Sequence, residues 1–306
     1  MEIDIRDAFF DEVSNIAKQD HTVVIVTNDM DVFSLRKFRE EFPQRFIDVG
    51  VAEQNLINVA SGLASTGKKV IVFGILSFLT TRCYEQIKLN ICGMKLPVVI
   101  VGIGPGLSFS YDGPTHHSTS DIGSFRLIPH LQILNPSEAR TAKKSAQIAL
   151  EFDRPTLVRL DKGVFHQPFN DKKIENGLVV HITGNQNLII YTGTIGKVVI
   201  HAHELLQANG DSWGVIELFQ ISPLPKSLLE ILSHVKRIVV IEENSEVGGL
   251  FSILAEVIVL REESILVSQI SLPNEQTFSY GERDWLSQNL GLNTLEKVGP
   301  SHLGSK

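Results

Sequence analysis

The sequence predicts an α/β protein of two domains, each a mostly parallel sheet flanked by helices. Three observations predict it: a length of 306 residues, a hydrophobic content of 43%, and the alternation of short Val- and Ile-rich runs with helical stretches. A chain of this length usually forms about two domains. Runs that are apolar on both faces are typical of parallel strands covered by helices on both sides.

The first half of the chain contains five such apolar runs. They lie at 22–27, 69–74, 97–103, 131–135 and 155–160. Helical patterns occupy 53–65, 77–92 and 137–150 between them. This strand–helix alternation predicts a first α/β domain over residues 1–168.

A change of composition marks the predicted boundary between the domains. The stretch "FHQPFNDKKIENG" (165–177) is polar and contains Pro, Asn and Gly, so we expect a linker over 169–184. A second series of strands follows at 187–192, 213–218, 237–243 and 265–270. Helical patterns at 195–208, 226–234 and 249–261 alternate with them and predict a second, smaller α/β domain over 185–306.

Composition and charge argue against several classes of protein. The formal net charge is −7, which gives no support for binding nucleic acid or an anionic membrane. The two cysteines, Cys83 and Cys92, lie in one helix-like segment, which argues against a disulfide scaffold and for a reducing cytoplasm. The N-terminus lacks the pattern of a signal peptide, and no apolar run approaches the ~20 residues of a membrane span. We expect a cytoplasmic protein.

Glu53 is the first candidate for a functional side chain. It follows a strand end at 46–47 and a glycine turn, and it opens the helical stretch 53–65. A carboxylate in the first turn of a helix can simply stabilise the helix dipole. It can also belong to a ligand site, because α/β proteins bind ligands at the carboxyl edge of their parallel strands. The pattern alone leaves both interpretations open.

The loop "YDGPTHHSTSD" (111–121) is the second candidate. It gathers Asp112, His116 and His117 after a predicted strand, so it also lies at the carboxyl edge of the sheet. A surface turn is the simple alternative, but clustered ionisable groups on a loop favour a functional site. No second group of Cys or His residues has the spacing of metal ligands, so the pattern favours acid–base or hydrogen-bonding chemistry over metal binding.

Several motifs carry a family resemblance. The segments "GVAEQNLINVASGLASTGKKVIVFGILSF", "YDGPTHHSTSDIGSFRLIPHL" and "NPSEA" resemble the pyrimidine-binding domain of transketolases and of 1-deoxyxylulose-5-phosphate synthases. The stretch 187–306, with "GTIGK", "ISPLP", "VVIEEN" and "GGL", is similar to the C-terminal domain of the same enzymes. The resemblance covers nearly the whole chain.

The resemblance implies that thiamine diphosphate is the cofactor. Glu53 matches the glutamate that hydrogen-bonds the N1′ nitrogen of the aminopyrimidine and so takes part in catalysis. Phe78 matches the phenylalanine on which that ring stacks. Met30, after Asp29, matches a bulky apolar residue that touches the cofactor, and we expect both residues in the cofactor site.

The resemblance also implies substrate-binding residues. Asp112 and the catalytic His116 match residues that bind the hydroxyl groups of a sugar, and His117 is similar to the synthase branch, which has "DGPTHH". The positions that match the family's phosphate-binding residues are Arg6, Ser34 and Lys162. Many transketolases have a histidine eight residues before the aspartate of this motif, and Gly104 stands there in this chain.

One part of the family pattern is missing. Complete transketolases hold the metal and the diphosphate with Gly-Asp-Gly followed by Asn, and we find no such pair in this sequence. We therefore expect a C-terminal subunit that transfers a two-carbon ketol unit between sugars or sugar phosphates together with an N-terminal, diphosphate-binding subunit. The expected assembly is an α2β2 heterotetramer that shares thiamine diphosphate, with Mg²⁺ or Ca²⁺ held by the partner.

Three alternatives remain open. The chain could be a synthase-like carboligase subunit that uses pyruvate, or a non-catalytic regulatory relative. It could also be a beta-type subunit of a 2-oxo acid dehydrogenase, although those subunits lack "DGPTHH". Retention of Glu53, Phe78, Asp112 and His116 argues against the regulatory alternative.

Overall fold

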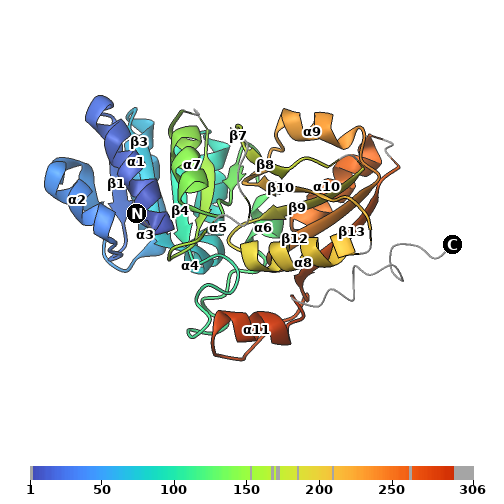
Figure 1. Ribbon diagram of the computed structural model, residues 1–306. Coiled ribbons are helices and arrows are strands. Elements are labelled where there is room, and N and C mark those ends of the chain that lie inside the picture. Colours follow the sequence, from blue (N-terminus) through green and yellow to red (C-terminus); the bar gives the residue numbers. More distant parts are fainter. Residues whose placement is uncertain are drawn as a thin grey trace.

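The structure is a computed structural model that describes residues 3–151, 154–166, 169, 173–184, 186–208, 210–261 and 264–292. Two sheets lie next to each other, and helices cover both faces of each sheet (Figure 1). Residues 293–306, the end of the predicted second domain, lie outside the described residues. The predicted fold class of two α/β domains is confirmed.

The first sheet has seven strands in the order β11-β5-β6-β4-β3-β1-β2. All neighbours pair in parallel except β11 and β5. The strands are β1 (Val23–Thr27), β2 (Phe46–Asp48), β3 (Lys69–Ile75), β4 (Val98–Ile103), β5 (Gln132–Leu134), β6 (Thr156–Leu160) and β11 (Gln220–Ser222). Each residue of β1, β4 and β6 is buried, as expected for parallel strands covered on both faces.

Helices cover both faces of this sheet. One face carries α1 (Ile5–Gln19), α2 (Phe33–Glu41) and α7 (Ala139–Glu151), whose buried side chains share a core with Ile25 and Phe73. The other face carries α3 (Glu53–Ser65), α4 (Leu76–Arg82) and α6 (Asp121–Phe125), which pack against Val24 and Val72. The short turn η1 (Pro43–Arg45) precedes β2.

The predicted helix over 77–92 is interrupted. It consists of α4, the single turn α5 (Tyr84–Gln86) and the wider π-helical segment η2 (Ile87–Gly93). Cys83 separates the first two, because its backbone leaves the helical region at φ −114° and ψ 14°. Cys83 and Cys92 are buried free thiols, and burial raises the pKa of each to about 12. The break makes α4 a short, separate helix that ends at Arg82.

The second sheet has six strands in the order β13-β12-β9-β10-β8-β7. They are β7 (Lys173–Ile174), β8 (Leu178–Ile182), β9 (Asn187–Thr192), β10 (Gly214–Leu218), β12 (Arg237–Ser245) and β13 (Leu266–Leu272). The helices around it are α8 (Gly196–Ala208), α9 (Lys226–Leu232), α10 (Leu250–Leu260) and α11 (Arg283–Asn289). The four strands predicted from the second series of apolar runs pair in parallel.

The sequence analysis missed three strands near the domain boundary. The stretch 169–184, expected to be a linker, contains β7 and β8, which pair antiparallel at the edge of the second sheet. β11 follows β10 in the chain but pairs with β5 of the first sheet. β7 and β11 are edge strands of two and three residues, too short to show a pattern of their own, whereas β8 is an apolar strand that the polar residues around it concealed. Because β11 crosses between the sheets, the two domains are joined by backbone hydrogen bonds.

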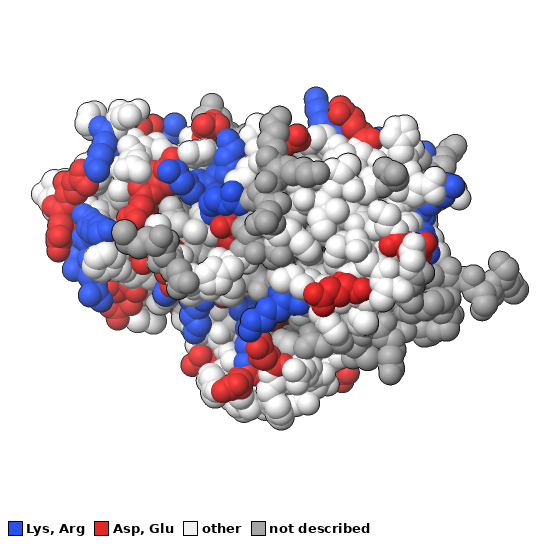
Figure 2. Space-filling model, in the orientation of Figure 1, with Lys and Arg blue, Asp and Glu red and all other residues white. Residues whose placement is uncertain are grey.

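The surface has no strong segregation of charge on the face that Figure 2 shows. Lys and Arg side chains are interspersed with Asp and Glu over the first domain, and much of the second domain carries neither (Figure 2). Across the described residues, none of the helices combines the length and the apolar character that crossing a bilayer requires.

Candidate active site

The predicted site residues follow the ends of neighbouring strands. Because β1, β2, β3, β4 and β6 are parallel, their carboxyl ends meet at one edge of the first sheet. The segments that leave this edge carry Asp29 and Met30, Glu53, Phe78, the loop 104–117 and Lys162. The topology therefore brings together residues that are up to 133 positions apart in the chain.

Glu53 and Phe78 meet through an arginine that the sequence analysis did not identify. The Glu53 side chain is nearly buried at the first turn of α3, and its Oε1 accepts a hydrogen bond of 3.0 Å from Nη1 of Arg82. The guanidinium carbon of Arg82 lies 3.7 Å from the centre of the Phe78 ring. Phe78 and Arg82 are four residues apart on α4, a spacing that places two side chains on one helix face and could have predicted the pair.

The loop that carries the two histidines (111–121, the histidine loop) packs against Phe78. The ring centres of His116 and Phe78 are 4.8 Å apart, and the Thr115 hydroxyl lies 3.0 Å from Nδ1 of His116. The Ser77 hydroxyl of α4 donates to the Thr115 carbonyl over 3.0 Å, which ties the loop to the helix. Asp112 is exposed, four residues before His116. His116 is thus held beside Phe78, whereas the Asp112 side chain remains in contact with solvent.

The two adjacent histidines face different surroundings. His116 is half-buried beside Phe78, whereas His117 is buried and lines a separate small cavity with Leu107 and Leu272. Burial lowers the pKa of His117, although the Glu243 carboxylate acts in the opposite direction. The structure therefore separates the environments of two side chains that the motif places side by side.

The Phe109 ring lies beside His116 and Lys162 and approaches Gly104 closely. Gly104 has φ +93°, and a Cβ atom added there would lie 2.2 Å from the Phe109 ring. The same ring lies 5.7 Å from His116, centre to centre, and 4.1 Å from the Lys162 ammonium. A glycine is required at 104, both by this backbone conformation and by the close approach of the ring. No side chain can occupy the place where many transketolases have a histidine unless Phe109 moves.

The predicted phosphate residues do not form one cationic site. Arg6 pairs with Asp4 over 2.7 Å. Ser34 is fully buried, and its hydroxyl lies 2.8 Å from Oδ1 of Asp7 and 3.2 Å from Oδ1 of Asp11. These two carboxylates would repel a phosphate, so the structure argues against Ser34 as a phosphate ligand.

Arg6 and Lys162 nevertheless belong to segments that touch. The Ile5 N–H donates to the Gly163 carbonyl over 2.9 Å, and the Gly163 N–H donates to Oδ2 of Asp4 over 2.9 Å. These contacts fix the start of α1 against the turn that follows β6. Of the three predicted residues, only these two remain candidates for binding an anion.

Asp29 and Met30 lie on the turn after β1. Asp29 has φ +63°, and its N–H donates to Oδ1 of Asp48 over 2.9 Å. The same oxygen accepts the N–H of Gly50 over 2.9 Å, so Asp48 joins the turns that follow β1 and β2. Met30 is half-buried against the core beneath the sheet edge. This turn therefore has a fixed position beside the segment that leads to Glu53.

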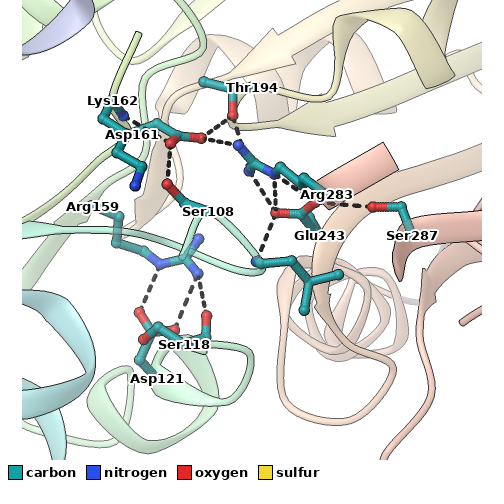
Figure 3. Close-up of polar contacts among 11 residues, drawn as sticks. Ser108, Ser118, Asp121, Arg159, Asp161, Lys162, Thr194, Glu243, Arg283 and Ser287 are labelled. Atoms are coloured by element: carbon teal, nitrogen blue, oxygen red, sulfur yellow. Dashed lines mark hydrogen bonds and ion pairs between the residues drawn. The ribbon is translucent and has the colours of Figure 1, made fainter. Parts of the chain in front are cut away.

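A second arginine joins the two domains through a network of polar contacts (Figure 3). Arg283, the first residue of α11, donates to Oδ2 of Asp161 over 2.7 Å and to Oε2 of Glu243 over 2.6 Å. Ser108 and Thr194 also donate to the Asp161 carboxylate, and the Leu107 N–H donates to Glu243. Five segments from both domains therefore meet at one buried network, which the sequence analysis did not predict.

Arg283 and Asp161 in this network each stabilise the ionised form of the other. Burial alone would raise the pKa of Asp161, but Arg283 and the hydrogen bonds of Ser108 and Thr194 outweigh it and hold that pKa below its usual value. Burial would lower the pKa of Arg283, but Asp161 and Glu243 raise it well above the ordinary value. Asp161 and Arg283 are therefore both ionised at neutral pH.

A neighbouring pair anchors the end of the histidine loop. Arg159 of β6 and Asp121 of α6 are both buried and form two hydrogen bonds, of 2.6 and 3.1 Å. Arg159 also donates to the Ser118 carbonyl. Within the part of the chain that the structure describes, no three His, Cys, Asp or Glu side chains gather as metal ligands would.

The fold is that of a two-domain α/β protein whose predicted site residues lie at the carboxyl ends of parallel strands. The family "Transketolase, pyrimidine binding domain" matches residues 1–167, and "Transketolase, C-terminal domain" matches residues 177–293. The chain belongs to the transketolase family.

Individual relatives agree with this assignment. The chain is 30% identical over 281 residues to one subunit of the apulose-4-phosphate transketolase of Phocaeicola vulgatus, an alignment that covers 88% of each chain. It is 30% identical over 291 residues to 1-deoxy-D-xylulose-5-phosphate synthase of Heliobacterium modesticaldum, covering 93% of this chain and 44% of the synthase. A solved structure described as a split gene transketolase, an inactive beta4 tetramer, is similar with a TM-score of 0.84 and 27% identity, covering 98% of this chain and 97% of that one.

Proposed function

We propose that this chain is the C-terminal subunit of a two-component, thiamine-diphosphate-dependent transketolase that transfers a two-carbon ketol unit between sugars. The observation that carries the proposal is the arrangement of Glu53, Phe78 and His116 at one sheet edge. The similarity to a subunit of an apulose-4-phosphate transketolase, over most of both chains, supports it.

The residues at this edge fit the pyrimidine half of the cofactor. The Arg82 guanidinium is planar, lies over the Phe78 ring and donates an N–H to Glu53. A flat, nitrogen-containing ring can make the same two kinds of contact. Glu53, Phe78, Asp29 and Met30 would hold that half, and an N-terminal subunit would hold the diphosphate with Mg²⁺ or Ca²⁺. When bound, thiamine diphosphate supplies the carbon that carries the two-carbon unit.

Glu53 has the position of a proton-handling group. Its carboxylate is nearly buried, lies at the first turn of α3 and has one cationic hydrogen-bond donor, Arg82. A carboxyl group held in such a place can keep or release a proton at its Oε atoms when a nitrogen base faces it. These features support the proposal that Glu53 carries the catalytic proton transfer on the cofactor side.

The histidine loop would bind the sugar. His116 is fixed beside Phe78, and Asp112 lies four residues before it on the same loop. Both side chains can bond hydroxyl groups, and a site that bonds hydroxyl groups discriminates strongly against analogues that lack them. Lys162 and Arg6 would contribute positive charge toward a sugar phosphate. His117 would support the loop from its buried cavity and contribute to substrate binding only through it.

The expected assembly is an α2β2 heterotetramer in the cytoplasm, acting in carbohydrate metabolism. A synthase-like carboligase subunit is the second candidate, and the double histidine and the similarity to a 1-deoxy-D-xylulose-5-phosphate synthase favour it. The two candidates share the cofactor and differ in the donor, a ketose for the transketolase and pyruvate for the synthase.

Co-expression tests the proposal. The chain should be purified with the product of a neighbouring gene that encodes Gly-Asp-Gly followed by Asn, and assayed with a panel of ketose donors and aldehyde acceptors. We expect ketol transfer by the mixture and none by either component alone. Condensation of pyruvate with an aldehyde, without ketol transfer, would favour the synthase alternative. A mixture that forms a complex but catalyses neither reaction would contradict both.

A further inference from the structure

Arg82 covers the two groups that the proposed function assigns to the cofactor. Its guanidinium lies 3.7 Å from the centre of the Phe78 ring, and its Nη1 lies 3.0 Å from Oε1 of Glu53. The guanidinium is flat and delocalised, so it stacks on an aromatic ring as a heterocycle does. One side chain thus satisfies both the aromatic face and the carboxylate of the site.

The position of Arg82 allows it to leave. Arg82 is the last residue of α4, and 49% of its side chain is exposed, compared with 9% for Glu53. A long, half-exposed side chain at a helix end can rotate into water without disturbing the core. Glu53 and Phe78, in contrast, are fixed by the first turn of α3 and by the middle of α4.

We propose that Arg82 is a stand-in for the cofactor: its guanidinium occupies the pyrimidine subsite in the free subunit and must move out when the pyrimidine binds. The role assigned to Arg82 rests on the proposed function, because it requires that Phe78 and Glu53 bind the pyrimidine. The arginine keeps Glu53 paired while the chain is without its partner. It also competes with the cofactor, and it therefore lowers the affinity of the chain for it.

The size of this competition follows from the two contacts that are lost. A half-exposed cation–π contact and a half-exposed ion pair are each weak, and together they correspond to a roughly 3- to 30-fold change in affinity. Removing the arginine should therefore tighten binding of the pyrimidine by this factor. A residue that served only to complete the binding site would have the opposite effect when removed.

Thiamine is a suitable probe, because it carries the pyrimidine and lacks the diphosphate that the partner subunit would hold. The full chain should be titrated with thiamine, and binding followed by NMR at millimolar concentrations. Arg82→Ala should bind thiamine roughly 3- to 30-fold more tightly than the wild type. Arg82→Lys keeps the charge but loses the planar group, and its affinity should lie between the two.

A matched control is available on α7. Arg140 pairs with Glu138 over 3.1 Å, and the exposures of the two side chains, 50% and 7%, are close to those of Arg82 and Glu53. Arg140→Ala should leave thiamine affinity unchanged. Phe78→Ala should abolish binding in the wild-type and the Arg82→Ala backgrounds, which places the probe in the proposed subsite.

Each outcome is informative. Equal or weaker binding by Arg82→Ala, with wild-type binding intact and sensitive to Phe78→Ala, would overturn the role of Arg82 alone. If Arg82→Lys binds thiamine with the wild-type affinity, the planar shape of the guanidinium does not contribute to the competition. If no variant binds thiamine, or if Phe78→Ala leaves binding unchanged, the proposed pyrimidine site is wrong and the role of Arg82 falls with it.

Discussion

Two of the arginine–carboxylate contacts in the molecule have similar lengths but different settings. Arg82 and Glu53 meet at the open edge of the first sheet, with half of the arginine side chain exposed. Arg283 meets Asp161 and Glu243 at the domain junction, where 23%, 1% and 8% of the respective side chains are exposed. The distances alone, 3.0 Å in the first pair and 2.6–2.7 Å in the second group, do not distinguish their roles.

The difference lies in what remains when the arginine leaves. Arg82 is half-exposed and covers a single carboxylate, so its departure would open Glu53 to solvent or a ligand. Arg283 is mostly buried and pairs with two carboxylates, Asp161 and Glu243, which would be left buried without a cation. A half-exposed ion pair contributes little to stability, but a buried charge without its partner is costly. The first contact is therefore exchangeable and suits a binding site, and the second holds the domains together behind that site.

The largest effect should come from Glu53→Gln in the reconstituted enzyme. The amide cannot exchange a proton as the carboxyl group does, and proton-transfer groups typically contribute ~10²–10⁴ in rate. We expect turnover to fall by this factor while the unfolding midpoint of the chain stays unchanged. Transfer kinetics and thermal unfolding check the two parts. A variant that retains more than about a tenth of the wild-type rate would remove Glu53 from catalysis.

Arg283→Ala should have a large effect on stability. Breaking a buried ion pair typically costs about 3–5 kcal/mol, because the remaining charge stays buried. Lys197→Ala is the control. Lys197 of α8 pairs with Asp284, the neighbour of Arg283 on α11, but both side chains of this pair are mostly exposed. The control should change the free energy of unfolding by less than about 0.5 kcal/mol. Similar losses in the two variants, measured by denaturant unfolding, would refute the contrast between the pairs.

His116→Ala should reduce activity with a hydroxylated ketose donor. Losing one partner of a buried hydrogen bond costs about 1–3 kcal/mol, which corresponds to a roughly 5- to 150-fold loss. His117→Ala is the natural comparison, because His117 lies in a separate buried cavity. We expect that variant to lose stability rather than turnover. Donor kinetics and unfolding curves of both variants decide, and equal activity losses would mean that both histidines contact the substrate.

Glu217 is a third carboxyl group that can be compared with Glu53 and with the pair Asp161 and Glu243. Glu217 of β10 is fully buried, and in the described structure its Oε1 accepts the Ser137 N–H over 3.1 Å without an arginine partner. Burial raises its pKa from 4.5 to about 7. Between these pH values the folded protein holds a proton that the unfolded chain has lost. Glu217 therefore makes the protein less stable as the pH rises through this range, by about 1.4 kcal/mol per pH unit.

Glu217→Gln should remove this part of the pH dependence. His181 lies 3.8 Å from Glu217, and burial lowers its pKa to about 4, so it contributes a slope of the opposite sign between its folded pKa and its usual value of 6.5. Because His181 is present in both proteins, the difference between their unfolding free energies isolates Glu217. That difference should change steadily between pH 5 and pH 7, ~1.4 kcal/mol per unit, and parallel curves would contradict the raised pKa.

The sequence predicted the parts of the fold that bury apolar surface on two faces. β1, β3, β4, β6 and α3 begin and end within two residues of the predicted positions. The parallel topology then placed Glu53, Phe78 and the histidine loop at one edge. The short edge strands β7 and β11 escaped prediction, because their pairing partners, not their composition, make them strands. The apolar run of β8, which lies between β10 and β7, was overlooked inside the stretch expected to be a linker.

The features of the site that the sequence did not predict depend on contacts between residues that are far apart in the chain. Arg283 and Asp161 are 122 positions apart, and no local pattern links them. Ser34 matched a phosphate ligand by resemblance, but Asp7 and Asp11 of α1 cover its hydroxyl, which only the packing of α1 against α2 reveals. Arg82 is the exception, because its spacing from Phe78 on the predicted helix contained the signal.

Calorimetric titration of thiamine diphosphate in the presence of Mg²⁺ tests the central claim most directly. The claim is that this chain holds the pyrimidine half of a cofactor site and that a second subunit completes it. We expect no micromolar binding to the chain alone, and tight binding once the diphosphate-binding partner is added. Micromolar binding of thiamine diphosphate to the isolated chain would contradict the claim.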